Sequence, residues 1–381
     1  MISLIEFEIK KFLNRKKNLL VISILVILAA IFITLNSSLD KNSSINTIAS
    51  IESEIKSIEE ALNKVESEII RLPDNEKLKW INSDYEKELS LLRDMKNSYI
   101  SNDYNKYLQS KIELDKKLLK NIEDENVIYS DDPNEIINDI ELNTLLLENS
   151  IKPINTSVSM EGFNFIKLFL NSPISIILVI LILILSSDVV SSEFDSNTYK
   201  LLFTQPISKN KIIISKIIST LIMVNVILFS VIAICFIILG AVNGFGDINY
   251  PIEFYNNGVI EYISIGKFIL YELILFIILT AFMCILGVFI SSLSKSTSNS
   301  VAVSIIITVS AYMISSQGFI SKLEHLNPFI YFDISSVLQG KSANLFTNVN
   351  INFKYGVVTL MVSIIILLIP LIKKNNMKLT L

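Results

Sequence analysis

The sequence is poor in the residues on which most catalytic and metal sites depend. Its 381 residues include one histidine, His325, and two cysteines, Cys235 and Cys284, which both lie inside apolar runs. These numbers exclude a disulfide scaffold and a cysteine-based zinc site, and they argue against a histidine-based triad. Charged residues make up only 18%, below the roughly 25% of soluble domains. The net charge of −4 argues against nucleic acid as a partner.

Apolar residues are what the sequence has in abundance. They make up 51% of it, and the mean hydropathy is +0.53. A chain with so few polar residues cannot cover its apolar side chains in water. We therefore predict an all-α integral membrane protein. A helix that crosses a bilayer needs about 20 mostly apolar residues. Six stretches meet this requirement: 19–35, 165–187, 217–241, 268–290, 299–317 and 356–372.

The distribution of lysine and arginine predicts the orientation of these spans. Segments 1–18, 188–216, 291–298 and 373–381 carry thirteen such residues, whereas the short loops on the other side, 242–267 and 318–355, carry four. The positive-inside rule therefore places both termini in the cytoplasm, with the spans in the plasma membrane. Segment 1–18 is predicted to be an amphipathic interfacial helix. The first apolar run is also compatible with a signal peptide, but its 17 residues and the lack of an A-x-A site favour an uncleaved anchor.

Residues 36–164 form a long polar insert, predicted to lie outside the membrane between the first two spans. Over 36–170 there are 16 Lys or Arg and 26 Asp or Glu. Eight apolar residues in the insert alternate at spacings of three and four, which is a heptad seam about 37 Å long in a helix. They are Ile48, Ile51, Ile55, Ile58, Leu62, Val65, Ile69 and Leu72. Pro73 ends this helix, and helices at 76–125 and 134–149 follow, so we predict a coiled-coil-like helical hairpin.

Two interpretations of the seam remain open. The seam residues form the core of the hairpin itself, or they belong to an arm that docks a substrate or an extracytoplasmic partner. Pairing of two copies through the same seam is a further alternative.

The loop at 188–216 has a distinctive order of residues. Residues 193–203 form a short amphipathic stretch, Pro206 interrupts it, and Ser208 is a good N-cap for the next helix. An exposed amphipathic helix on such a loop lies on lipid headgroups or enters a groove on a partner protein.

This loop resembles the signature of ABC-2 type permeases of ABC transporters. In that family, an acidic residue, Gly-Thr, Leu-x-x-Pro-[Ile/Val]-Ser-[Arg/Lys] and a lysine follow the second span. The matching residues here are Glu193, Thr198, Leu202, Pro206, Ile207, Ser208, Lys209 and Lys216, with Asn197 in place of the glycine. Residues 325–333 are similar to a second family segment, Pro-Phe-x-Tyr-Phe-Asp. The six spans and the insert after the first span also fit, although the resemblance says nothing about 36–164.

The resemblance implies a coupling helix that sits on a separate ATPase subunit. The implied coupling residues are Glu193, Thr198, Tyr199, Lys200, Phe203, Pro206 and Lys209. It also implies two permeases, identical or sister chains, that work with two ATPase subunits in the lipid bilayer. ATP and Mg²⁺ would be bound by the ATPase subunits, and this chain would need no cofactor. The family analogy favours export of a peptide, an antibiotic or a lipid-like molecule.

A nucleotide site in this chain is not expected. Gly340-Lys341-Ser342 imitates the end of a P-loop, but Ser335 stands where that motif needs glycine, and the segment is predicted to lie outside. Segment 318–355 is predicted to be an outer loop, and the family resemblance implies that it re-enters the outer leaflet as short helices. Asn225 and Glu272 are candidates for the translocation surface because they are polar residues inside predicted spans. The alternative for Glu272 is an interfacial residue paired with Lys267.

Two other classes of function compete with a transporter permease. One is a membrane-anchored envelope scaffold that acts through its helical hairpin, for which one or two spans would suffice. The other is an ion-coupled secondary transporter, which would need several intramembrane acids and two related halves. A neighbouring gene that encodes a P-loop ATPase would favour the permease.

Overall fold

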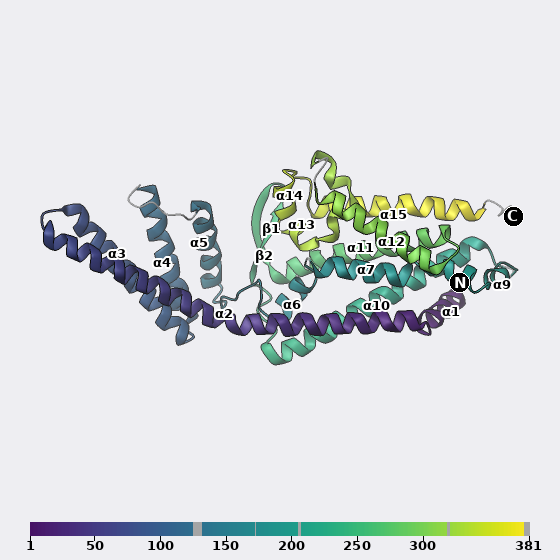
Figure 1. Ribbon diagram of the computed structural model, residues 1–381, viewed down its shortest axis with the longest axis horizontal. Coiled ribbons are helices and arrows are strands. Elements are labelled where there is room, and N and C mark those ends of the chain that lie inside the picture. Colours follow the sequence, from purple (N-terminus) through teal and green to yellow (C-terminus); the bar gives the residue numbers. More distant parts are fainter. Residues whose placement is uncertain (125–131, 172, 205–206, 318–320, 377–381) are drawn as a thin grey trace. The chain divides into compact units, whose positions relative to one another are not determined.

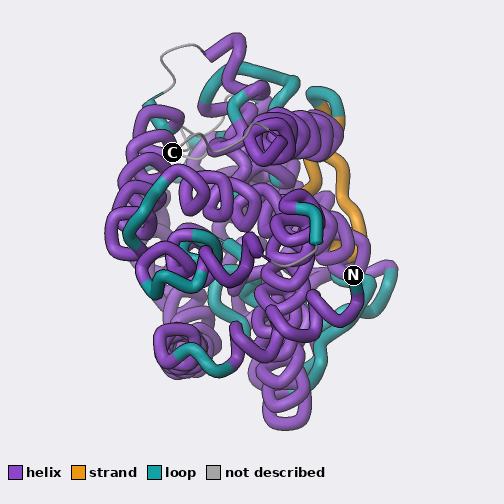
Figure 2. The backbone as a smooth tube through the Cα atoms, turned by 90° about the vertical axis from the view of Figure 1, so that its right-hand side faces the viewer, coloured by secondary structure: helices purple, strands orange, loops and turns teal. Residues whose placement is uncertain are grey.

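A computed structural model of the chain describes residues 1–124, 132–171, 173–204, 207–317 and 321–376. Helices make up 79% of it, and Figures 1 and 2 show them as the dominant element, with one two-stranded ribbon. The chain divides into two compact units. We call Met1–Thr34 with Glu161–Leu381 the membrane unit and Leu35–Met160 the hairpin unit.

The membrane unit is built from long helices that short elements connect. Its elements are α1 (Ile2–Leu13), the first part of α2 (Lys16–Arg71), α6 (Gly162–Phe169), α7 (Ile174–Ser186), α8 (Ser191–Asp195), α9 (Tyr199–Thr204), α10 (Lys209–Asn243), β1 (Pro251–Asn256), β2 (Val259–Ser264), α11 (Ile265–Leu293), α12 (Thr297–Ser315), the 3₁₀ helices η1 (Ser321–Leu326) and η2 (Pro328–Phe332), α13 (Ile334–Leu338), α14 (Lys341–Leu345) and α15 (Phe353–Asn376).

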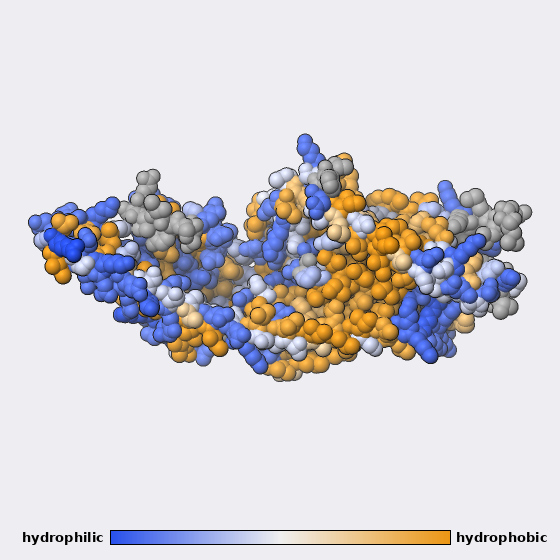
Figure 3. Space-filling model, viewed as in Figure 1, coloured by the Kyte–Doolittle hydropathy of each residue, from blue (hydrophilic) through white to orange (hydrophobic). Residues whose placement is uncertain are grey.

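Six helices of the described residues are long and apolar enough to cross a membrane, which confirms the predicted fold class. Five of these candidate spans are Ile174–Asp195, Lys209–Asn243, Ile265–Leu293, Thr297–Ser315 and Phe353–Lys373, and the sixth lies within α2. An apolar band covers the helices of the membrane unit, and hydrophilic side chains gather at the end that carries α1 and α9 (Figure 3). The protein is therefore a multi-pass membrane protein.

Two predicted elements have different limits in the structure. The stretch 165–187, expected as one span, is divided into α6 and α7. Pro173 stands at the N-cap of α7, where its fixed ring and missing N–H prevent a continuous helix. By contrast, α2 does not end with its apolar run but continues to Arg71. No glycine or proline occurs between residues 16 and 71, so nothing in the local sequence stops that helix before Pro73.

α11 forms the centre of the membrane unit. It packs against α6, α7, α10, α12 and α15, and its side chains Phe268, Leu275, Phe276 and Leu279 are fully buried. At Gly287 the helix approaches α7 so closely that a Cβ atom would lie 2.2 Å from the Ser186 hydroxyl oxygen. Glycine is needed here because no side chain fits between the two helices.

A β-hairpin in the membrane unit was not predicted. β1 and β2 pair antiparallel, with Asn256 opposite Val259. Asn257 and Gly258 form the two-residue loop, with φ of +52° and +99°. Asn-Gly is the strongest short signal for such a turn because both residues tolerate positive φ. The prediction for 242–267 overlooked that signal, since it considered only charge and apolar length.

The hairpin unit contains the rest of α2 and three further helices. These are α3 (Glu76–Ile100), α4 (Tyr104–Glu123) and α5 (Pro133–Glu148). Asn75, Asp103 and Asp132 cap their N-termini with side-chain oxygens. The helix expected at 76–125 is divided at 101–103, where Asn102 has φ of +59° and Asp103 starts α4.

The heptad seam lies along the part of α2 that faces α3. Ile51 is buried, Ile48 and the five seam positions from Ile55 to Ile69 are half-buried, and Leu72 at the end is 53% exposed. Two ion pairs join the helices: Glu59 with Arg93 at 2.8 Å, and Glu52 with Lys96 at 2.7 Å. Leu92, Leu108 and Leu146 form the best-buried part of the core of this unit.

Candidate functional site: the charged layer around Glu193

The loop that carries the family-like motif folds into two short helices. α8 ends at Asp195, a turn follows at Asn197, and α9 begins at Tyr199. Asn197 has φ of +53°, the left-handed conformation that glycine adopts most readily and asparagine tolerates. Asparagine therefore allows the left-handed turn between α8 and α9.

Glu193 is the centre of a buried charged cluster, and only 3% of the residue is exposed. Its Oε1 accepts hydrogen bonds from the Lys11 ammonium at 2.5 Å and the Lys216 ammonium at 2.7 Å. Its Oε2 accepts one from the Thr198 hydroxyl at 2.5 Å. Two cations and a hydroxyl thus offset the cost of burying this carboxylate. Glu193 and Thr198, both predicted as coupling residues, are brought together by the Asn197 turn.

Lys216 connects this cluster to the first helix. Its ammonium lies 2.8 Å from Glu8 Oε1 as well as 2.7 Å from Glu193, and the residue is 1% exposed. Glu8 comes from α1 and Lys216 from α10, so one lysine joins three segments that are far apart in sequence. Removing one member of such a buried network costs about 3–5 kcal/mol, because its partners stay buried without compensation.

A second group of charges lies beside the first. Asp188 pairs with Lys17 at 2.7 Å and with Arg15 at 3.2 Å. Arg15 also donates to the Ser192 hydroxyl at 2.7 Å, and Lys17 donates to the Ile184 carbonyl at 2.5 Å. We call the whole set the charged layer. It consists of Glu8, Lys11, Arg15, Lys17, Asp188, Glu193 and Lys216.

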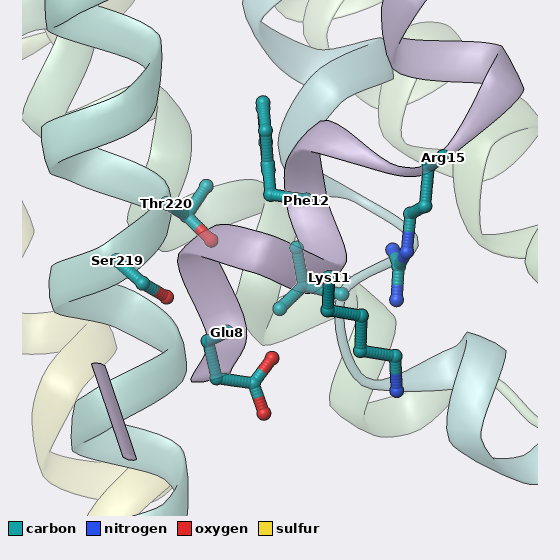
Figure 4. Close-up of a pocket in the computed structure, with 7 residues that line it drawn as sticks. Glu8, Lys11, Phe12, Arg15, Ser219 and Thr220 are labelled. Atoms are coloured by element: carbon teal, nitrogen blue, oxygen red, sulfur yellow. The ribbon is translucent and has the colours of Figure 1, made fainter. Parts of the chain in front are cut away.

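The charged layer leaves little empty space. In Figure 4, Ser219 and Thr220 of α10 face Glu8 and Phe12 of α1, and the cavity among them has a volume of about 10 Å³. That volume holds about one water molecule. The arrangement therefore suits a mechanical joint between helices and not the binding of a small molecule.

Hydrogen bonds also tie the loop to two other spans. The backbone N–H groups of Val190 and Ser191 donate to the Ser291 hydroxyl of α11 at 3.0 and 2.9 Å. Asp195 accepts from the backbone and the hydroxyl of Thr297, where α12 begins, at 2.8 and 2.6 Å. Hydrogen bonds and ion pairs therefore connect α8 to α1, α10, α11 and α12.

The other predicted coupling residues lie on the surface or outside the described part. The Tyr199 ring stacks on Phe194 at 4.9 Å, Lys200 is exposed, and Lys209 at the start of α10 is half-exposed. Phe203 belongs to α9, but its side chain lies outside the described part, as does the whole of Pro206. Tyr199 and Lys200 thus lie next to the charged layer without being part of it.

The two translocation candidates lie inside the helix bundle. Asn225 of α10 accepts a hydrogen bond from Thr280 of α11 at 3.1 Å and donates to the Leu221 carbonyl at 2.8 Å. Glu272 is fully buried on α11, and neither carboxylate oxygen has a hydrogen-bond partner among the described residues. The alternative pairing of Glu272 with Lys267 does not occur, since Lys267 is exposed. The structure therefore shows no hydrogen bond between Asn225 and Glu272.

Most of the charged layer was not predicted from the sequence. The lysines and the arginine near residue 15 were interpreted only as positive-inside anchors, and Glu8 was not considered. One signal was available in the sequence. Glu8, Lys11, Phe12 and Arg15 are spaced to lie on one face of a helix, and that face combines an acid, two basic residues and an apolar residue. Its partners, however, are about 200 positions away, and no local pattern identifies them.

Comparison with known proteins agrees with the geometry. The family model described as "ABC-2 family transporter protein" matches residues 2–372, nearly the whole chain. No curated protein and no solved structure matched. The match includes α1, the loop with α8 and α9, and all six candidate spans. The chain therefore belongs to the ABC-2 family of transporter proteins, as a permease subunit that spans the membrane.

Proposed function

We propose that this protein is the permease of an ATP-driven exporter, and that its ATPase subunit docks on the α8–α9 loop. Membership of the family supports an ABC ATPase as a partner. The observation that carries the proposal is the position of Glu193: it belongs to the loop, yet Lys11 of α1 and Lys216 of α10 bind it. A partner that moves this loop therefore moves the helices as well.

In this proposal the residues of the loop have two different roles. Tyr199, Lys200 and Lys209 belong to the docking surface, because they are at least partly exposed. Phe203 and Pro206 are assigned to the same surface from the motif alone. Glu193 and Thr198 act as positioning residues, since Glu193 is buried among its partners. The docking surface receives the ATPase, and the positioning residues transmit its movement.

The transport cycle that we propose uses ATP bound elsewhere. Two ATPase subunits hold ATP and Mg²⁺, and their closure pushes two copies of the permease, or this chain and a sister chain, between inward- and outward-facing states. With the termini in the cytoplasm, the loop faces the ATPase. The cargo is a peptide, an antibiotic or a lipid-like molecule, and Asn225 and Glu272 line its path.

Purification of the tagged protein from its native membrane in mild detergent tests the proposal. We expect a stoichiometric ATPase subunit to co-purify and to hydrolyse ATP. Lys200→Glu should weaken its binding without lowering the thermal stability of the permease, because Lys200 is exposed. Glu193→Gln should lower that thermal stability and reduce the stimulation of ATP hydrolysis by the permease.

Glu6→Gln is the matched control, since it makes the same chemical change on the exposed side of α1. If no nucleotide-binding subunit co-purifies while other membrane complexes stay intact, the proposal is wrong, and the envelope scaffold becomes the better explanation. If Glu6→Gln and Glu193→Gln act alike, the charged layer does not transmit the movement.

A further inference from the structure

A cavity of about 310 Å³ lies in the membrane unit, at the end of α12 opposite the charged layer. α12 begins at Thr297, which is bound to Asp195, and ends at Ser315. Its 19 residues span about 28 Å, close to the thickness of the hydrocarbon core. The last turn of α12 therefore reaches the depth of the lipid headgroups at the other membrane surface.

Among the described residues, the wall of the cavity carries one fixed anion and one available cation. Asp333 accepts hydrogen bonds from the backbone and the hydroxyl of Ser336 at 3.2 and 2.9 Å, so its carboxylate is held in place as the N-cap of α13. Lys341, at the start of α14, is exposed, and its ammonium makes no ion pair or hydrogen bond with the described residues. The cavity thus presents opposite charges from two neighbouring short helices.

The rest of the lining is amphipathic. The Tyr312 ring stacks on Phe332 at 5.6 Å, which fixes an aromatic wall on the α12 side. Leu345 at the end of α14 is 74% exposed and the following residue, Phe346, is buried, and both line the cavity. Serines of α12, α13 and α14 also line the cavity. A ligand with a polar, doubly charged head and an apolar chain fits this set of side chains.

We propose that this cavity binds the headgroup of a phospholipid that carries both a phosphate and a primary ammonium. Lys341 binds the phosphate, Asp333 accepts hydrogen bonds from the ammonium, and the chains follow Tyr312 and Leu345 into the bilayer. A headgroup with phosphate alone meets the Asp333 carboxylate and is repelled. A choline headgroup has no N–H to donate to it. The inference depends on the membrane location of α12, not on transport.

Native mass spectrometry of the full-length protein in detergent tests this lipid preference. The probes are phosphatidylethanolamine, phosphatidylcholine and phosphatidylglycerol with identical acyl chains. We expect phosphatidylethanolamine to bind about tenfold more tightly than the other two, the effect of one charge-assisted hydrogen bond. Lys341→Gln should weaken binding of phosphatidylethanolamine about tenfold, and Asp333→Asn should abolish its advantage over phosphatidylcholine. Asparagine is as good an N-cap as aspartate, so α13 stays folded.

Lys322→Gln is the control, because Lys322 is an exposed lysine of η1 that does not line the cavity. It should leave the binding of all three lipids unchanged. Equal binding of the three lipids, or equal losses in Lys322→Gln and Lys341→Gln, would overturn the proposal. So would displacement of the lipid by millimolar glycerophosphoethanolamine, since the ligand would then be a soluble zwitterion and not a lipid.

Discussion

The membrane unit and the hairpin unit both contain acid–base pairs, but the pairs differ in their surroundings. In the membrane unit, the side chains of Lys216 and Glu193 are 2% and 4% exposed. In the hairpin unit, those of Arg93 and Glu59 are 58% and 43% exposed. Buried charges need partners, whereas solvent screens exposed pairs. The same residue types thus form a buried joint around Glu193 and a solvent-exposed link between α2 and α3. The hairpin unit also contains a buried pair, Lys117 with Glu88, whose side chains are 8% and 10% exposed.

The largest effect that we predict tests the buried side of this comparison. Lys216→Met should lower the free energy of unfolding by about 3–5 kcal/mol, because Glu8 and Glu193 lose their shared cation. Thermal unfolding in detergent measures the loss. Lys211→Met, an exposed lysine of the same helix, is the control and should have little effect. If Lys216→Met loses no more unfolding free energy than Lys211→Met, the buried pairs contribute no more to stability than exposed charges do.

The second prediction concerns packing inside the membrane unit. Gly287→Val should destabilise the protein by about 1–3 kcal/mol, since any side chain there collides with Ser186. Gly287→Ala should have a smaller effect, and Ser186→Ala should partly relieve it by removing the hydroxyl that lies nearest. The same unfolding assay measures all three. If Gly287→Val is neutral, the contact between α7 and α11 is looser than the structure shows.

A smaller effect is expected in the hairpin unit, from a half-buried acid on α4. The pKa of Asp115 is raised from 3.8 to about 6: burial is the main cause, Lys111 opposes the rise, and Asp139 and Glu54 add to it. Protonation therefore stabilises the fold: the gain is complete below pH 3.8 and is lost as the pH rises through about 6. Asp115→Asn should remove this pH dependence and add about 1 kcal/mol at pH 7, a figure reduced for solvent screening.

Hydrogen exchange of the α4 amides between pH 4 and pH 7 measures this effect in the full-length protein, after correction for the intrinsic exchange rate. Glu113→Gln provides the control, because Glu113 is 57% exposed on the same helix and pairs with Lys87. The protection of the α4 amides should fall toward pH 7 in both the wild type and this control. A wild-type profile that rises with pH would contradict the assigned direction of the pKa.

The smallest effect tests the exposed side of the comparison. A double-mutant cycle of Arg93→Gln and Glu59→Gln should give a coupling energy of about 0.2–1 kcal/mol that decreases with added salt. Chemical unfolding of the hairpin unit within the full-length protein gives the four free energies that the cycle needs. A salt-independent coupling above about 2 kcal/mol would mean that this pair is shielded from solvent.

Particular residues show how far the sequence predicted the fold and the site. Pro73 marked the end of the long helix correctly, and the Asn197 turn followed from its place in the motif. Pro173 was not interpreted as a helix break, because the span at 165–187 was predicted from the length of its apolar run alone. The Asn257–Gly258 turn was overlooked for a similar reason. In the site, Glu193 and Thr198 were named as coupling residues, but the burial of Glu193 was not predicted.

The sequence by itself determined the class of the protein, since apolar runs of sufficient length have one stable location, a membrane, and that property is local. It also determined the long α2, because nothing between residues 16 and 71 interrupts a helix. Only the tertiary structure decided which charges meet. Glu8 and Lys216 are 208 positions apart, and their pairing depends on how α1 packs on α10. The burial of these charges depends on that packing, and the strength of the interaction between them depends on their burial.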